Sequence, residues 1–512
     1  MSRKSQNQYK RSFLLAAAVV ILLFLFWNKD SAKSYVRHQL APQNNEVADI
    51  DLPNLLGGIE DTRLPCANLP GAADVVVVVK TGFTVAQKRL PMHIETTYRC
   101  IPNLLIYSDA EQTIAGHKIH DALADLAPSI LDSSDDFQFY RKIKEAQSAG
   151  LKVSDVSSKD DIDTAWRLDK WKNIPLLVKA AEYKPDAKWY IFIDADTYPV
   201  WSNMLHWLSR KNHNKRIYLG CQAWIGDTVF GHGGSGYILS NAAMRAAKAE
   251  IDKDTMHYYN IPDSECCGDV AVAVLLRDYL DLNLTTSWPM IQGETPGTLD
   301  YTQEKWCKTV VSYHHVDADE VDALWRFEQH WLRWMGEQQQ VLGTGGAGSG
   351  TEQTVVSAPP ILHRDIYDYF VAPLMRKPIM NWDNMSRDRT LRGAEGRKKK
   401  DNEENDDENN DEENKDNDEN QNEDEEDEET EDHTDYWNDA DKVAHTSFAN
   451  CKKACEADEW CLGYSYLPGE CHISHVIRLG GEAKGETFGM RSGWMPERIE
   501  QKRKEWGPCE ED

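Results

Sequence analysis

The 512-residue chain has no Cys-x-x-Cys pair among its 11 cysteines, which excludes zinc-ribbon and thioredoxin-type sites. It has too few long apolar runs for a polytopic membrane protein, since its mean hydropathy is -0.62. Positive charge is almost absent from residues 401–432, which hold 21 of the 85 Asp and Glu residues and one Lys. Most of the net charge of -28 is therefore local, and no basic surface for nucleic acid is indicated.

One long apolar run is present, at residues 13–27, and it follows a basic segment that contains no acidic residue. A helix of this length spans about 22 Å, whereas the early-secretory bilayer is about 27 Å thick. The run fits a signal peptide cleaved after Ser34 and also a short signal anchor. Both place the basic tail in the cytosol and the following chain in the lumen.

The cysteines agree with export, because in an exported chain they are expected to form disulfides. Their odd number leaves at least one thiol free or paired between chains. Two N-x-S/T sequons, at Asn283 and Asn384, are compatible with a luminal glycoprotein.

The texture of the chain from residue 74 to about 336 is typical of an α/β domain. Helical patterns at 90–99 and 166–183 alternate with apolar runs that predict buried strands, and these runs lie at 75–79, 104–107, 189–193 and 217–220. A strand, a helix and a second strand in succession indicate a parallel sheet.

Two carboxylates, Asp194 and Asp196, come directly after the predicted strand at 189–193. Ligands of open α/β sheets bind beyond the carboxyl ends of the strands. Carboxylates there can hold a divalent cation, which can neutralise a nucleotide diphosphate. The alternative for an isolated Asp-x-Asp is a solvated turn.

Three further segments carry polar or glycine-rich patterns, and each also has a purely structural explanation. The glycines of 231–236 permit close approach to a ligand or form a tight loop before a helix near Asn241. Asp269 is a candidate base or a helix cap. The pair His314-His315 offers metal ligands or packed histidines.

Taken together and in this order, the segments resemble glycosyltransferase family 31, with its Fringe and core 1 β1,3-galactosyltransferase branches. The matching motifs are Lys80-Thr81, Asp194-Ala-Asp196-Thr-Tyr, Gly233-Gly234-Ser235-Gly236-Tyr, Gly268-Asp269-Val-Ala-Val and Ser312-Tyr-His314-His315-Val-Asp317. The chain departs from the family at Ala195 and Gly268, where the family usually has acidic residues.

The resemblance implies a GT-A fold and an inverting transferase that moves a sugar from a UDP-sugar to a glycan or glycoprotein hydroxyl, forming a β1,3 linkage. Asp194, Asp196 and His314 would hold Mn²⁺ or another divalent cation, with His315 as the substitute for His314. Asp269 would be the catalytic base. The nucleotide sugar would be bound by Lys80, Thr81, Asp194, Gly233, Gly234, Ser235 and Gly236.

Two tryptophans, Trp224 and Trp288, are candidates to stack on sugar faces, with core packing as the alternative. Members of the family are single-pass type II Golgi membrane proteins with a luminal catalytic domain, so the resemblance also favours the anchor at 13–27.

The C-terminal segment Cys451-x3-Cys455-x5-Cys461 and Cys471 resembles a PAN/Apple domain, in which the first two cysteines would lie one helical turn apart and face a small disulfide-rich α+β sheet. Such modules bind protein or carbohydrate. The competing hypothesis is therefore a non-catalytic binding protein that acts through this module.

The predicted division is a cytosolic tail at 1–12, a transmembrane anchor at 13–27, a stem at 28–70, a GT-A domain at 71–340, a linker and C-terminal extension at 341–393, a disordered acidic segment at 394–435 and a PAN/Apple-like domain at 436–512.

Overall fold

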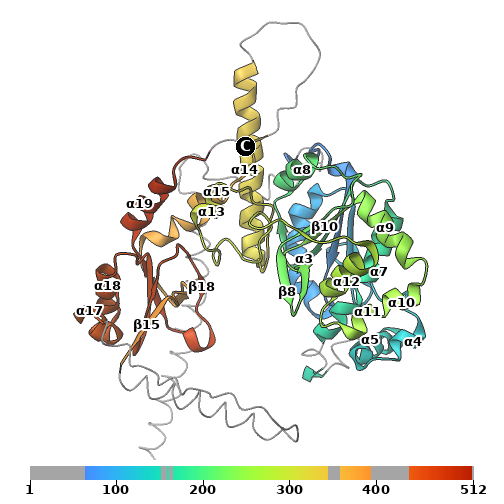
Figure 1. The fold of residues 1–512 in the computed structure, drawn as a ribbon, viewed down its shortest axis with the longest axis horizontal. Helices are drawn as coiled ribbons and strands as arrows, with labels where there is room; N and C mark the ends of the chain where they lie inside the picture. The colour runs from blue at the N-terminus through green and yellow to red at the C-terminus, as the bar shows by residue number, and fades with distance from the viewer. Residues whose placement is uncertain (1–63, 152–157, 161–164, 344–357, 394–436, 510–512) are drawn as a thin grey trace, which may run out of the picture. The chain divides into compact units, whose positions relative to one another are not determined.

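A computed structural model describes residues 64–151, 158–160, 165–343, 358–393 and 437–509. The predicted stem and the acidic segment at 394–435 lie outside the described residues, apart from 64–70. The described chain divides into two compact units (Figure 1). The first holds the residues up to Gly293 together with Val310–Pro360, and the second holds Glu294–Thr309 and the residues from Ile361 onward.

The first unit is built on an eight-stranded mixed sheet in the order β11-β7-β10-β5-β1-β2-β4-β3. Parallel strands β2 and β5 flank β1, and β10 is antiparallel to β5. The strands are β1 (Val75–Lys80), β2 (Leu104–Ser108), β3 (Gln112–Ile114), β4 (His117–Asp121), β5 (Trp189–Asp194), β7 (Tyr218–Gly220), β10 (Tyr237–Ser240) and β11 (Thr285–Thr286).

Helices cover the sheet because β1 is apolar on both faces. Val76 and Val78 belong to one core cluster with buried residues of α5, α7, α9 and α12, which places those helices on one face. The principal helices are α3 (Phe83–Glu95), α5 (Gln138–Ser148), α7 (Asn173–Tyr183), α8 (Trp201–Ser209), α9 (Asn241–Ile251), α12 (Gly268–Leu280) and α14 (Ala318–Gly343).

Shorter elements complete this unit. Two small antiparallel ribbons lie outside the main sheet, one formed by β6 with β12 and one by β8 with β9. The elements are α4 (Pro128–Leu131), η6 (Ala165–Trp171), β6 (Tyr198–Pro199), β8 (Gln222–Ile225), β9 (Thr228–Gly231), α10 (Thr255–Tyr259), α11 (Ile261–Ser264) and β12 (Ser312–Tyr313).

The α/β class and the parallel pairing of the first strands are confirmed. The predicted strands at 75–79, 104–107, 189–193 and 217–220 are β1, β2, β5 and β7. The helix predicted at 90–99 begins earlier, at Phe83, because Ala86 and Leu90 are both fully buried and extend its apolar face.

The second unit contains a five-stranded antiparallel sheet in the order β13-β19-β16-β17-β15. Its elements include α13 (Gln303–Trp306), α15 (His363–Ile366), β13 (Ile379–Met380), β14 (Trp382–Asp383), β15 (Arg389–Arg392), α17 (Asp439–Val443), α18 (Phe448–Ala457), β16 (Gly463–Leu467), β17 (Glu470–Ser474), β18 (Gly481–Glu482), β19 (Arg491–Trp494) and α19 (Pro496–Trp506). The segment predicted as a linker and extension, 341–393, thus supplies strands to this sheet.

Disulfides join the parts of the second unit. Helix α18 carries Cys451 and Cys455, as predicted, and they pair with Cys471 in β17 and with Cys461. A further bond joins Cys307 to Cys509. In the first unit, Cys66 pairs with Cys100, and the neighbours Cys266 and Cys267 are also joined.

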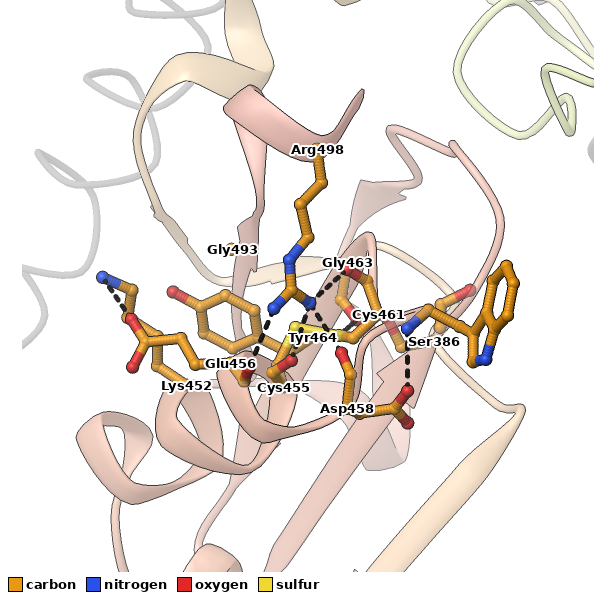
Figure 2. The surroundings of a disulfide bond; sticks show 12 residues. Ser386, Lys452, Cys455, Glu456, Asp458, Cys461, Gly463, Tyr464, Gly493 and Arg498 are labelled. Atoms are coloured by element: carbon orange, nitrogen blue, oxygen red, sulfur yellow. Dashed lines mark hydrogen bonds and ion pairs between the residues drawn. A yellow bond between two sulfur atoms is a disulfide. The ribbon is translucent and has the colours of Figure 1, made fainter. Parts of the chain in front are cut away.

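One arginine closes the loop around the Cys455–Cys461 bond. The Arg498 guanidinium donates to the carbonyls of Cys455 at 3.1 Å, Glu456 at 2.8 Å, Asp458 at 2.6 Å and Cys461 at 3.2 Å (Figure 2). These carbonyls end helix α18 and the turn after it, so a cation there satisfies acceptors that the helix leaves unpaired.

The two sequons have different surroundings. Asn283 is exposed. Asn384 is 2% exposed, and its amide donates to the carbonyls of Tyr464 and Gly493, both at 3.3 Å. Asn384 is therefore inaccessible to a glycosylating enzyme in the folded second unit.

The predicted Golgi localisation through a single-pass anchor needs correction. Across the described ranges, the structure contains no helix with both the length and the apolar character needed to cross a bilayer, so such an anchor is not shown. The run at 13–27 itself lies outside those ranges. A helix of that run would span about 22 Å, less than a bilayer of about 27 Å.

Candidate metal centre

The parallel strands β1 and β5 end side by side at one edge of the sheet. Their register pairs Lys80 with Asp194, and the Lys80 ammonium lies 2.9 Å from the Asp194 carboxylate. Asp169 forms a second ion pair with Lys80. Burial opposes the charge of Lys80, but the two carboxylates outweigh it and raise its pKa above the ordinary value. Asp194 is therefore engaged by a cation of the protein itself.

Thr81, the residue after β1, is buried, and its hydroxyl oxygen has no hydrogen-bond partner among the described atoms. Its carbonyl accepts a hydrogen bond of 2.8 Å from the Lys172 ammonium, which also pairs with buried Asp109. The backbone at the end of β1 is thus fixed from within the core. The hydroxyl is a polar group that a bound ligand can satisfy.

Two histidines lie close to Asp196 because β6 pairs with β12 in antiparallel fashion. Asp196 precedes β6 and the histidines follow β12, so the pairing brings them to the same end of the ribbon. His314 Nε2 lies 3.6 Å from Asp196 Oδ1, and His315 Nδ1 lies 3.9 Å from Asp196 Oδ2. One ligand atom from each residue lies within 4.8 Å of the other two. A carboxylate and two imidazoles at this spacing form a donor set for a divalent cation.

The charge of Asp196 is stabilised by its neighbours. Arg89 Nη2 lies 3.0 Å from Asp196 Oδ2. Burial alone would raise the pKa of Asp196, but His314 and Arg89 outweigh it and lower the pKa to about 2. Asp196 is therefore ionised at neutral pH, as a metal ligand must be.

The glycine-rich loop between β9 and β10 packs against the cluster. A Cβ atom on Gly234 would overlap the His314 ring, so only glycine fits there. The Thr197 hydroxyl donates to the Gly234 carbonyl, and the Ser312 hydroxyl donates to the Ser235 carbonyl at 2.9 Å. The loop is thus tied to the segment between β5 and β6 and to β12.

Asp269 lies in the first turn of α12, opposite the same loop. The Gly233 amide donates to Asp269 Oδ2 at 2.7 Å, and the Val270 amide donates to Oδ1 at 3.0 Å. Burial nevertheless raises the pKa of Asp269 above its ordinary value, because it outweighs these two hydrogen bonds. A buried carboxylate with a raised pKa is a better proton acceptor than an exposed one.

The structure therefore brings together the predicted residues Asp196, His314 and Asp269 with the loop at 233–236. It places Asp194 beside Lys80, and it adds His315 to the ligand cluster. Sequence reasoning gave no role to Arg89. Its position within α3 carries no motif, and its contact with Asp196 is fixed by tertiary packing.

The tryptophans singled out from the sequence are not core residues. Trp224 in β8 is 68% exposed and Trp288 is 41% exposed. Strand β8 pairs with β9, which leads directly into the glycine-rich loop. Trp224 is therefore a surface aromatic on a ribbon attached to the candidate site.

The cluster also fits a cation by an unsatisfied atom. Asp196 Oδ1, the oxygen that faces His314 Nε2, is buried and has no hydrogen-bond partner among the described atoms. Groups of this kind are uncommon and point to a ligand or a catalytic role.

Comparison with protein-family models and with curated proteins found no match for the chain.

Proposed function

We propose that the protein is a metal-dependent inverting glycosyltransferase with a GT-A fold, similar to family 31, which moves a sugar from a UDP-sugar to a glycan or glycoprotein hydroxyl. The observation that carries the proposal is the convergence of Asp196, His314, His315 and Asp269 around one glycine-rich loop. Asp196, Asp269 and the histidine pair come from distant parts of the sequence and meet at the carboxyl ends of parallel strands, where ligands of such sheets bind.

Asp196, His314 and His315 would hold the cation, which we propose to be Mn²⁺. When bound, the cation would stabilise the negative charge that develops on the departing diphosphate. Carboxylate and imidazole ligands also suit Zn²⁺ and Fe²⁺, so the identity of the metal is part of the test.

Asp269 would act as the base. It takes the proton of the acceptor hydroxyl while that oxygen forms a bond to the anomeric carbon and the bond to the diphosphate breaks. The Gly233 amide holds the carboxylate in place through Oδ2. Exposed Trp224 would offer its ring to a sugar of the acceptor. A single displacement of this kind gives a β linkage from an α-linked donor.

For the second unit, we propose a PAN/Apple-like module. Its support is one helix joined by disulfides to an antiparallel sheet and to the following turn. A non-catalytic binding protein remains the competing hypothesis, and it requires no metal at the first unit.

The experiment is calorimetric binding of UDP to the full chain with Mn²⁺, Mg²⁺, Zn²⁺ or EDTA, followed by hydrolysis and transfer assays over a panel of UDP-sugars. We expect UDP affinity to depend on Mn²⁺ and one donor to be hydrolysed fastest. UDP affinity that is equal in Mn²⁺ and in EDTA would contradict the proposal.

A further inference from the structure

Arg89 lies on helix α3 and contacts the candidate metal centre through Asp196. Helix α3 begins directly after the end of β1, and Arg89 Nη2 reaches Asp196 Oδ2 at 3.0 Å. The Arg89 side chain is 40% exposed, whereas that of Asp196 is 10% exposed. The partly exposed arginine side chain therefore pairs with a carboxylate that is almost buried.

The same oxygen of Asp196 faces His315. His315 Nδ1 lies 3.9 Å from Oδ2, and Asp196 and His315 both belong to the donor set that fits a divalent cation. A cation bound by the Asp196 carboxylate and a guanidinium on the same carboxylate would repel each other at close range. Metal binding and the present Arg89–Asp196 ion pair are thus competing states of one carboxylate.

Arg89 is free to leave without loss of the helix. The face of α3 that holds it to the unit consists of Ala86, Leu90, His93 and Ile94, which are all buried. A guanidinium presents a planar fork of donors that matches phosphate oxygens. An arginine displaced from Asp196 by a cation would therefore remain near any anion that the cation binds.

We propose that Arg89 is an exchangeable counter-ion: it neutralises Asp196 while the metal is absent and transfers to the diphosphate of the nucleotide when metal and nucleotide bind. The inference rests on the proposed function for the identity of the diphosphate. Through this one positively charged side chain, metal binding and nucleotide binding would be linked.

The test measures Mn²⁺ binding to the full-length protein by electron paramagnetic resonance, first alone and then with UDP. Arg89→Met keeps the apolar stem and removes the charge. We expect it to bind Mn²⁺ alone about fivefold more tightly, the scale of a partly exposed ion pair. At saturating Mn²⁺ it should bind UDP at least about tenfold more weakly, the scale of a charged hydrogen bond.

Two comparisons make the result specific. Lys88→Met removes the same charge from the exposed neighbouring position of α3 and should change neither affinity. Inorganic pyrophosphate should lose as much affinity as UDP in Arg89→Met, because the diphosphate is the part of the nucleotide that the arginine would contact. Arg89→Lys should recover part of both effects.

The outcomes separate the inference from the proposed function. An Arg89→Met protein with unchanged or weaker affinity for Mn²⁺ alone would overturn the inference and leave the proposed function standing. Loss of UDP binding without loss of pyrophosphate binding would overturn the assignment of Arg89 to the diphosphate. A wild-type protein that binds Mn²⁺ but gains no UDP affinity from it would overturn the proposed function and the transfer of Arg89 together.

Discussion

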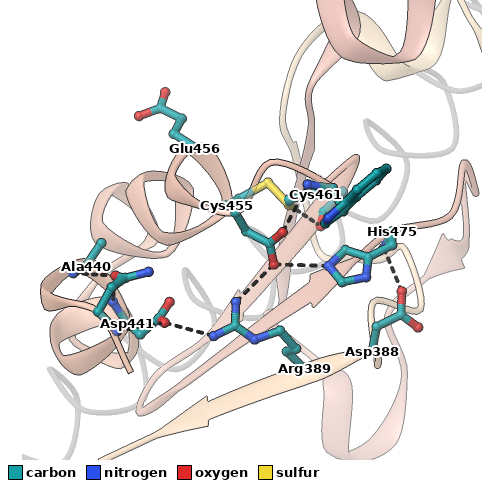
Figure 3. A network of polar contacts seen from close by, with 12 residues as sticks. Asp388, Arg389, Ala440, Asp441, Cys455, Glu456, Cys461 and His475 are labelled. Carbon is teal, nitrogen blue, oxygen red and sulfur yellow. Dashed lines mark hydrogen bonds and ion pairs between the residues drawn. A yellow bond between two sulfur atoms is a disulfide. The ribbon is translucent and has the colours of Figure 1, made fainter. Parts of the chain in front are cut away.

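Asp196 in the first unit and Asp458 in the second are both carboxylates placed beside an arginine and histidine, and the side chain of each is 10% exposed. Asp458 is bound closely: Arg389 lies at 2.9 Å, His475 at 3.0 Å, and the Trp460 amide donates at 3.1 Å. The Arg389 guanidinium donates both to this carboxylate and to Asp441, and Figure 3 shows it reaching Asp441.

Around Asp196 the histidines stand farther off, at 3.6 and 3.9 Å, and Oδ1 has no hydrogen-bond partner among the described atoms. Aspartate, arginine and histidine thus form a closely bonded structural cluster in the second unit. In the first unit, the histidines stand far enough from the aspartate to leave room for an ion. Both arrangements lower the pKa of the aspartate, so the pKa shift alone does not distinguish a structural site from a functional one.

The largest expected effect is a loss of sugar transfer on substitution of Asp269 in the first unit. Asp269→Asn keeps the size of the side chain but removes its basicity. We expect transfer to fall by about 10² to 10⁴, with Mn²⁺ and UDP affinities nearly unchanged. Asp263→Asn, at an exposed position of α11, is the matched control and should retain transfer. If the control loses transfer and Asp269→Asn retains it, the base is Asp263.

The second unit is the more dependent on covalent bonds, because its core cluster is far smaller than that of the first. Replacing Cys451 and Cys471 with alanine should lower its free energy of unfolding by about 2–5 kcal/mol. Urea unfolding, with UDP binding as the probe of the first unit, checks this. Equal loss of UDP binding in the same urea range would show that the units do not unfold independently.

The two aspartates themselves form a matched pair. Asp196→Asn should weaken Mn²⁺ binding at least about tenfold and leave the second unit's stability unchanged. Asp458→Asn should do the reverse and destabilise the second unit by about 1–3 kcal/mol, the cost of weakened charged hydrogen bonds. Calorimetry gives the Mn²⁺ affinity of each variant, and urea unfolding gives the stability of its second unit. Similar behaviour of the two variants would remove the distinction between the sites.

The smallest effect is the pH dependence contributed by Asp196. Its pKa is lowered from 3.8 to about 2, so its stabilisation is fully present above about 4 and is lost as the pH falls through about 2. The stability advantage of wild type over Asp196→Asn should therefore shrink by up to about 2 kcal/mol across that range. An advantage that is constant between pH 5 and pH 2 would contradict this assignment.

Strands β1, β2 and β5 could be predicted because each is a continuous apolar run that ends at polar residues. The resemblance implied a small sheet in the C-terminal unit, but its strands β13 and β15 could not be predicted, since they contribute only two and four residues and show no clear alternation. Helix α3 begins earlier than the sequence predicts, and Pro91, a residue typical of a first turn, lies inside it.

The candidate site shows the same limit. Motif order was enough to group Asp196, His314 and Asp269. It did not reveal that the register of β1 with β5 pairs Lys80 with Asp194, nor that α3 delivers Arg89 to Asp196. Such pairings depend on strand register and helix rotation, which a local sequence pattern does not encode.

The bond between Cys307 and Cys509 joins residues 202 positions apart in the sequence. Under mechanical load, tension applied to the C-terminal end would pass through the sulfur bridge directly to residue 307. The intervening chain, including the whole five-stranded sheet, would bear none of that tension. At about 3.5 Å per residue, reduction of this one bond would release roughly 640 Å of extensible chain, because the intact Cys451–Cys471 bond keeps 20 of the 202 positions closed. The five-stranded sheet is thus mechanically shielded from the C-terminus for as long as the bridge stays oxidised.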